Sequence, residues 1–114
     1  MSEDRIKRKE LLLKLDAIKR QKDWIDAVEA LGFRTTYGGK HPYVIRDPEN
    51  PKDEDITSLV ATIPFNLYKQ MNKIIFKEIL FSPISARMGI TEDMLWKALG
   101  LLWKVFDTIV FVLQ

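Results

Sequence analysis

Hydrophobic residues recur at helical spacing near the start of the chain. Leu11, Leu15 and Ile18 follow one another at steps of three and four, with lysine and arginine among the positions between them. This spacing places the apolar side chains on one side of a helix. The pattern predicts a helix over residues 5–20.

A second amphipathic stretch follows directly. Asp23 is of a residue type that caps helices, Trp24 and Val28 supply an apolar side, and Gly32 would end the helix. No glycine or proline separates the two stretches. One long helix over residues 4–31 is therefore an equally good interpretation.

The hydrophobic period changes to two after this point. Residues 33–37, 43–46 and 56–63 are short runs of β-branched, aromatic and aliphatic residues, which predict strands. A Gly-Gly pair follows the first run and is typical of a hairpin turn. Residues 48–55 (PENPKDED) predict a polar, acidic loop between the second and third strands.

Two further helices are expected in the second half of the chain. Asn66 is a suitable cap for one of them, and Thr91 for the other, which would extend to the end of the chain. The first of these helices is expected to bury an apolar stripe made of Leu67, Met71, Ile74, Ile75 and Ile79.

This order predicts an α+β fold of the α-β-β-β-α kind with a three-stranded antiparallel sheet. Extra helices would lie at both termini, as in an elaborated double-stranded-RNA-binding-like domain. We expect one domain over residues 1–114, because 114 residues is an ordinary size for one. Its parts are an N-terminal helical extension (1–21), a core (22–90) and an apolar C-terminal helix (91–114).

Composition excludes several classes of protein. The chain has no cysteine and one histidine, so disulfide frameworks, thiolate nucleophiles and cysteine-ligated metals are ruled out. No cluster of His, Asp and Glu has metal-ligand spacing, and we expect no metal and no cofactor. The apolar runs are shorter than a membrane span and carry charges, and no signal peptide is visible. These features predict a cytoplasmic protein with no membrane segment.

Charge is unevenly distributed although the net charge is only +2. Residues 65–91 carry four Lys/Arg against one acidic residue, and residues 41–64 carry two against five. Lys69, Lys73 and Lys77 recur every fourth position and would form a stripe on one helix. The stripe is either a row of RNA phosphate contacts, joined by Arg34, or an ordinary solvated surface.

His41 is the best candidate for a residue with chemical function. It follows Gly39 and Lys40 at the predicted hairpin turn, between Tyr37 and Tyr43. Histidine titrates near neutral pH, and a glycine turn lets the backbone approach a ligand closely. A general base beside a cation could cleave an RNA phosphodiester, with Gly39 and Lys40 contacting the RNA. The alternative is a solvated histidine without a function.

The run GFRTTYGGKHPYVIRDP, followed by ATIPFN and a helix, resembles the HicA-type toxins of toxin–antitoxin systems. The resemblance covers about residues 22–90. It implies a double-stranded-RNA-binding-like fold, metal-independent cleavage of messenger RNA by His41, and silencing by a HicB-like antitoxin. Many family members carry a histidine where this chain has Asn66.

Two alternatives to a HicA-like ribonuclease remain open. One is a non-catalytic RNA-binding module of the same fold. The other is a protein-interaction or oligomerising subunit, because the C-terminal helix has more apolar residues than one buried side requires. We expect this helix to pack on the N-terminal helix first, with self-association as the next alternative and a cofactor pocket as the last.

Overall fold

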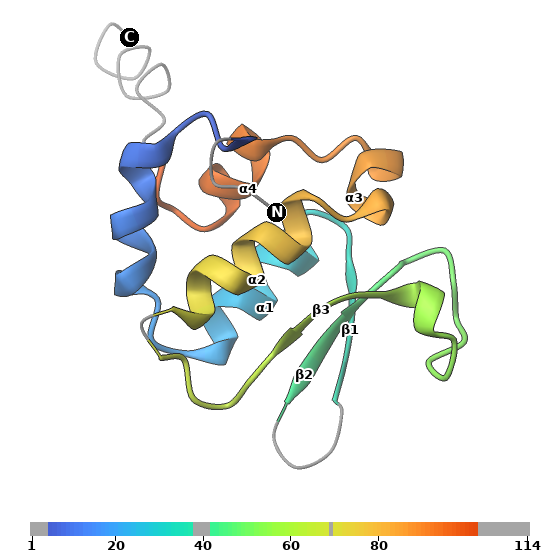
Figure 1. Ribbon diagram of the computed structural model, residues 1–114. Coiled ribbons are helices and arrows are strands. Elements are labelled where there is room, and N and C mark those ends of the chain that lie inside the picture. The colour runs from blue at the N-terminus through green and yellow to red at the C-terminus, as the bar shows by residue number, and fades with distance from the viewer. Residues whose placement is uncertain (1–4, 38–41, 69, 103–114) are drawn as a thin grey trace, which may run out of the picture.

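The computed structural model describes residues 5–37, 42–68 and 70–102. The chain runs from a 3-10 helix through one α-helix into a sheet, and three further α-helices follow the sheet (Figure 1). The elements in order are η2 (Lys9–Ala17), α1 (Gln21–Ala30), β1 (Arg34–Tyr37), β2 (Tyr43–Arg46), η3 (Ile56–Ser58), β3 (Leu59–Ile63), α2 (Met71–Leu80), α3 (Pro83–Met88) and α4 (Glu92–Ala98).

The sheet confirms the predicted α+β fold with three antiparallel strands. The strand order is β1-β2-β3, and both neighbouring pairs are antiparallel. The third strand begins at Leu59 and not at Ile56, because the Asp55 side chain accepts a hydrogen bond from the Thr57 N–H at 2.9 Å. This bond closes the short η3 turn ahead of the strand.

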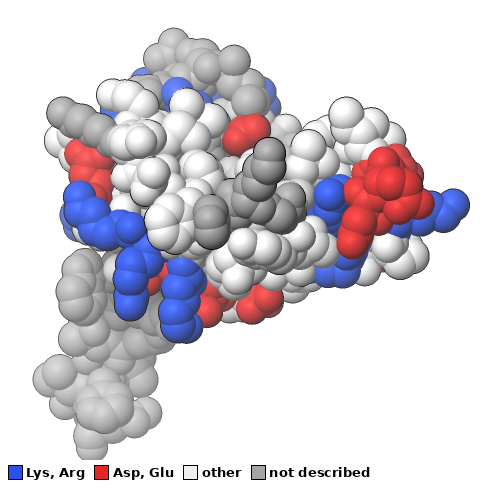
Figure 2. Space-filling view, turned by 90° about the horizontal axis from the view of Figure 1, so that it is seen from below, with Lys and Arg blue, Asp and Glu red and all other residues white. Residues whose placement is uncertain are grey.

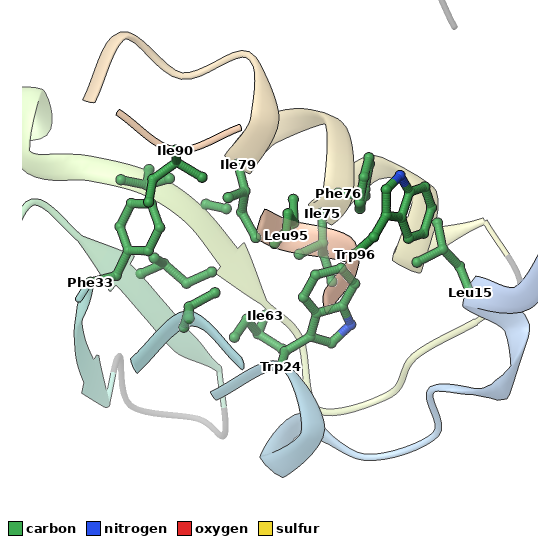
Figure 3. Packing of buried hydrophobic residues seen from close by; sticks show 14 of the residues in the cluster. Leu15, Trp24, Phe33, Ile63, Ile75, Phe76, Ile79, Ile90, Leu95 and Trp96 are labelled. Carbon is green, nitrogen blue, oxygen red and sulfur yellow. The ribbon is translucent and has the colours of Figure 1, made fainter. Parts of the chain in front are cut away.

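Helices α1 and α2 pack against the sheet and enclose one hydrophobic core (Figures 1 and 3). Trp24 of α1, Ile75 of α2 and Ile63 of β3 are all fully buried in it. Helix α4 closes the core from the far side, where the rings of Phe76 and Trp96 stack with centroids 4.1 Å apart. The sheet and these helices therefore share one core.

Asn72 is a polar residue inside this core. Its side-chain oxygen accepts a hydrogen bond from the Trp24 indole N–H at 2.9 Å. Its amide nitrogen donates to the carbonyls of Leu15 at 2.7 Å and Ile18 at 2.9 Å. Buried polar groups need such partners. One amide thus ties η2, α1 and α2 together.

The N-terminal helices differ from prediction. Residues Lys9–Ala17 form a 3-10 helix, and Ile18 is extended with φ −79° and ψ 113°, so a single helix over residues 4–31 is wrong. The Asn72 amide donates to the carbonyls of Leu15 and Ile18. In a continuous α-helix these carbonyls would accept hydrogen bonds from N–H groups of the following turn. Helix α1 begins at Gln21, and Asp23 accepts from Arg20 instead of capping the helix.

Helix α2 also differs in its start and in its buried side. It begins at Met71, and Asn66 is not its cap. Ile74, predicted to be buried, is 47% exposed, whereas Phe76 is fully buried. The helix is rotated from the predicted orientation because Asn72 points inward to its three partners. A short helix that was not predicted, α3, follows; Ser82 caps it and Pro83 is its first residue.

The predicted Thr91 cap is confirmed, since its hydroxyl accepts from the Met94 N–H at 3.2 Å. The predicted continuous helix over 91–114 is wrong, because α4 ends at Ala98. Gly100 turns the chain with φ +75°, and the Leu101 N–H bonds back to the Trp96 carbonyl at 3.0 Å. Residues 103–114 lie outside the described residues. Among those described, no helix is long and apolar enough to cross a membrane.

The N-terminal segment docks onto the start of α4. The Glu92 carboxylate accepts hydrogen bonds from the backbone N–H groups of Lys7 at 2.7 Å and Arg8 at 2.8 Å, and from the Trp96 indole at 2.9 Å. The Arg8 guanidinium also pairs with Asp93 at 2.7 Å. Lys7 and Arg8 thus bind the first turn of α4, and α1 packs on the same helix.

Candidate functional site

The hairpin that carries His41 is anchored by two tyrosines. The last residue of β1, Tyr37, pairs with the first residue of β2, Tyr43, and their rings meet edge to face with centroids 5.3 Å apart. Residues 38–42 connect them. The predicted site residues Gly39, Lys40 and His41 lie outside the described residues. The structure places Tyr37 and Tyr43, which flank them in the sequence.

Arg34 lies at the opposite end of β1 from this connection. It pairs with Arg46 in the sheet register, about 10 Å along the strand from Tyr37. Its guanidinium donates to Asp53 at 2.7 Å and to the Asn50 carbonyl at 2.5 Å. The acidic loop therefore holds Arg34 away from the hairpin connection, and its role in RNA binding stays a prediction.

Two lysines of the predicted stripe, Lys73 and Lys77, lie one turn apart on α2 and are partly exposed. Lys69 lies outside the described residues. The exposed side chain of Ile74 lies beside Lys73 in the helix. This side of α2 therefore combines positive charge with an apolar residue.

The acidic loop is fixed to α3 by a second arginine. Arg87 makes a two-pronged ion pair with the buried Asp47 carboxylate, in which the Nη1–Oδ2 distance is 2.9 Å, and its Nε lies 3.2 Å from Glu49. The hydrogen bonds from Arg87 hold the pKa of Asp47 below its ordinary value, against the opposing effect of burial. The loop's negative charge is thus partly neutralised, at the end of the sheet away from the hairpin connection.

Exposed aromatic rings gather around the hairpin end of the sheet. Tyr37 is 58% exposed, Phe65 is 62% exposed and Tyr68 is 68% exposed. Phe65 and Tyr68 belong to the loop that leaves β3, and β3 ends at Ile63, which pairs with Tyr43. Large apolar rings are usually buried, so several exposed ones at one end of a molecule indicate a binding surface.

A basic turn adjoins these rings. The Gln21 side chain donates to the Ile63 carbonyl at 3.0 Å and so fixes the turn before α1 to the end of β3. The exposed residues Lys19, Arg20 and Lys22 lie on this turn and at the start of α1. Figure 2 looks onto this end: Lys and Arg gather on one side with some acidic residues beside them, and a cluster of Asp and Glu lies on the other side among further Lys and Arg.

A pocket of about 220 Å³ is lined both by the basic turn before α1 and by the loop after β3 that bears exposed rings. It lies between the end of η2, the loop after β3 and the start of α2, and its lining residues are Asp16, Lys19, Leu67, Tyr68 and Asn72. Sequence reasoning missed Lys19, Phe65 and Tyr68 as site residues, because only the sheet pairing and the Gln21 bond bring them together.

The arrangement suits an elongated anionic ligand with flat groups. Cations can neutralise phosphates, and exposed rings can stack on bases. Over the described ranges, no three His, Asp or Glu side chains are placed to hold a metal ion. No protein-family model, curated protein or solved structure matches this chain.

Proposed function

We propose that this chain is a HicA-like endoribonuclease that cleaves messenger RNA without a metal and uses His41 as its catalytic base. The observation that carries the proposal is the pairing of Tyr37 with Tyr43, which assigns the Gly-Gly-Lys-His run to a hairpin connection. That connection belongs to the end of the sheet where exposed aromatic and basic residues gather.

The order α1-β1-β2-β3-α2 supports the proposed double-stranded-RNA-binding-like topology. The sequence resemblance over residues 22–90 has the same order of elements. The N-terminal segment and α4 lie outside the motifs that carry the resemblance and pack on each other. Both pack on the core that the sheet shares with α1 and α2.

The proposed reaction uses the 2′-hydroxyl of the RNA. His41 takes its proton, the 2′ oxygen attacks the adjacent phosphorus, and the bond from phosphorus to the 5′ oxygen breaks. Lys40 is the neighbouring cation that would stabilise the developing charge, because Asp53 holds Arg34 at the other end of the strand. The chain has a single histidine, so the leaving oxygen takes its proton from another group or from water.

Analysis of the cleaved ends tests this chemistry. Purified protein with EDTA should cut single-stranded RNA and leave 2′,3′-cyclic phosphate and 5′-hydroxyl ends. An otherwise identical strand with a 2′-deoxy sugar at the cut position should resist cleavage there. Ends that carry a 5′-phosphate, or complete loss of cleavage with EDTA, would contradict the proposal.

We further propose a HicB-like antitoxin as the protein partner and the cytoplasm as the compartment, because both accompany the resemblance to HicA toxins. Glu49 and other charged residues of the acidic loop offer a docking surface. Co-expression with a HicB-like antitoxin should suppress both toxicity and RNA cleavage.

The second candidate function is RNA binding without cleavage, which the exposed rings and the adjoining cations favour by themselves. It predicts steeply salt-dependent RNA binding that survives His41→Ala. It also predicts weaker binding when Lys69, Lys73 and Lys77 are replaced together. RNA cleavage by the wild type alone, and not by His41→Ala, would eliminate this candidate.

A further inference from the structure

The exposed rings at the hairpin end can stack on unpaired bases but not on the bases of an RNA duplex. The rings of a stacking surface contact the flat sides of bases, which a duplex hides between neighbouring base pairs. Phe65 and Tyr68 are 62% and 68% exposed on the loop after β3, and Tyr37 is 58% exposed at the end of β1, with β2 between the two strands. All three rings therefore belong to the same end of the sheet.

Positive charge adjoins the rings on one side. The bond between Gln21 and the Ile63 carbonyl anchors the turn that bears Lys19 and Arg20 next to the loop of Phe65. Lys19 and Tyr68 line one pocket, in which Asp16 supplies one opposing charge. A ring and a cation in the same pocket match a nucleotide, which has a base and a phosphate.

The neighbouring cations have local partners that an RNA phosphate could replace. Arg20 pairs with Asp23 at 3.1 Å, and Lys22 pairs with Asp26 at 2.8 Å. Both cations keep more than two thirds of their side chains exposed, at 71% and 68%. Exposed pairs of this kind contribute little to stability, so exchanging a carboxylate for a phosphate costs little.

A second group of acidic residues lies at the other end of β1. Glu49 and Asp53 of the acidic loop, and Asp47 directly before it, are paired with Arg87 and Arg34 there. Charge therefore favours an anionic chain that crosses the rings toward Lys19 and avoids the acidic loop. An acidic protein segment would meet the same cations, but it would not supply the flat groups that the rings fit.

We propose that Tyr37, Phe65 and Tyr68 form a stacking platform for unpaired RNA bases, with Lys19, Arg20 and Lys22 holding the adjoining phosphates. This inference rests on the proposed action on RNA. It specifies the substrate as single-stranded RNA and gives a route across the surface, from the end of β1 at Tyr37 to the turn before α1.

Binding can be measured apart from cleavage in the His41→Ala background. The probe is a fluorescein-labelled RNA of about twelve nucleotides, within the usual footprint of single-strand binding surfaces. The same sequence as a blunt duplex, and a strand of the same length without bases, serve as comparison ligands. Fluorescence anisotropy gives the Kd of each, and circular dichroism checks that every variant is folded.

We expect the single strand to bind more tightly than the duplex. Phe65→Leu combined with Tyr68→Leu keeps apolar side chains but removes the rings, and should raise the Kd for the single strand about tenfold or more. The Kd for the strand without bases should not change. Ile56→Ala, which alters a 79% exposed residue beside the acidic loop, is the matched control and should have no effect.

Replacing Lys19 and Lys22 by alanine should weaken binding of the single strand and of the strand without bases alike. For single strands the slope of log K against log salt should become shallower by about 0.7 for each phosphate that no longer has a lysine beside it. This second variant separates the phosphate contacts from the stacking.

Two results would overturn the platform. One is tighter binding of the duplex; the other is an unchanged Kd for the single strand in the Leu double variant, as expected if the rings serve a protein partner. Both are measured without cleavage. Failure of the platform is therefore distinct from failure of the proposed ribonuclease, which would be seen as intact RNA with the wild type.

Discussion

At the scale of single residues, Asn72 has the largest structural role for its size. Its one amide serves Trp24 in α1, the Leu15 carbonyl of η2 and the carbonyl of Ile18, which follows η2. Asn72→Leu keeps the volume but removes the partner of the buried Trp24 N–H and of the Ile18 carbonyl, while the Leu15 carbonyl keeps only its bond from the Ile18 N–H. We expect the free energy of unfolding to fall by about 2–4 kcal/mol, measured by urea denaturation.

Asn66→Ala is the control for this change, because Asn66 is exposed and polar and lies on the loop after β3. It should alter stability by less than about 0.5 kcal/mol. Equal stability of Asn72→Leu and the wild type would contradict the account of the core.

The ion pair between Asp47 and Arg87 predicts a pH dependence of stability. Because the pKa of Asp47 is lowered in the folded protein, the unfolded chain takes up the proton first as pH falls. The stabilisation is complete above the ordinary aspartate pKa of about 4 and is lost as pH falls through the lower folded-state value.

Urea denaturation at several pH values checks this dependence. Asp47→Asn should be less stable than the wild type at neutral pH, and the difference should disappear in acid. Asp26→Asn, which removes only a local helical pair with Lys22, should have little effect. A gap between Asp47→Asn and the wild type that persists unchanged in acid would contradict the assignment.

Residues near one another in sequence were the easier ones to predict. The Thr91 cap is visible because its partner, Met94, is three positions away. The role of Asn72 is not visible, because its partners lie 48 to 57 positions away. The prediction that Ile74 is buried was wrong for the same reason. Asn72 faces the core to reach its distant partners, and this orientation of α2 leaves Ile74 exposed.

At the scale of elements, the substitution Gly100→Ala tests where α4 ends. Gly100 has φ +75°, and among the described residues, its chain neighbours apart, no atom lies within 4 Å of an added Cβ. Gly100→Ala should therefore destabilise the protein by about 1 kcal/mol through backbone strain alone. In a helix that continued through residue 100 the same change would stabilise by about 1 kcal/mol.

The sign of the change in unfolding free energy decides between the two structures. Gly89→Ala is a matched variant, because Gly89 has φ +78° and similar open space. It should be destabilised to a similar extent. Stabilisation by Gly100→Ala would contradict the end of α4 at Ala98 and favour the continuous helix that the sequence pattern predicts.

The docking of the N-terminal segment on α4 makes a second prediction for the elements. Glu92→Ala removes the acceptor for the N–H groups of Lys7 and Arg8 and for the Trp96 indole. We expect a loss of about 2 kcal/mol in the free energy of unfolding and faster hydrogen exchange at residues 7 and 8. Glu54→Ala, on the acidic loop, should leave both unchanged; slow exchange retained in Glu92→Ala would refute the docking.

The sheet could be predicted from sequence, whereas the N-terminal 3-10 helix could not. Strand periodicity and a Gly-Gly turn are signals within a few residues, and β1 and β2 form where these signals lie. Leu12 and Leu15 have the three-residue step of a 3-10 helix, and Leu11 and Leu15 have a four-residue step typical of an α-helix, so the spacing does not decide between them. The contacts of Asn72 with Leu15 and Ile18 come from a distant part of the chain and are not visible in this pattern.

At the scale of the whole molecule, the two ends of the sheet carry different side chains. The acidic loop and its two arginine partners lie at one end, and the exposed rings with the turn that bears Lys19, Arg20 and Lys22 lie at the other. The sequence predicted the hairpin and His41 as the centre of the site. It could not predict the surrounding surface, because residues 19–22, 37 and 63–68 meet only in the fold.

The central claim is that His41 makes this surface a ribonuclease. The most direct test is RNA cleavage by the purified wild type, His41→Ala and the control Lys52→Ala, together with growth arrest when each is induced in cells. The account predicts cleavage and arrest with the wild type and Lys52→Ala, and neither with His41→Ala. Full cleavage by His41→Ala would contradict it.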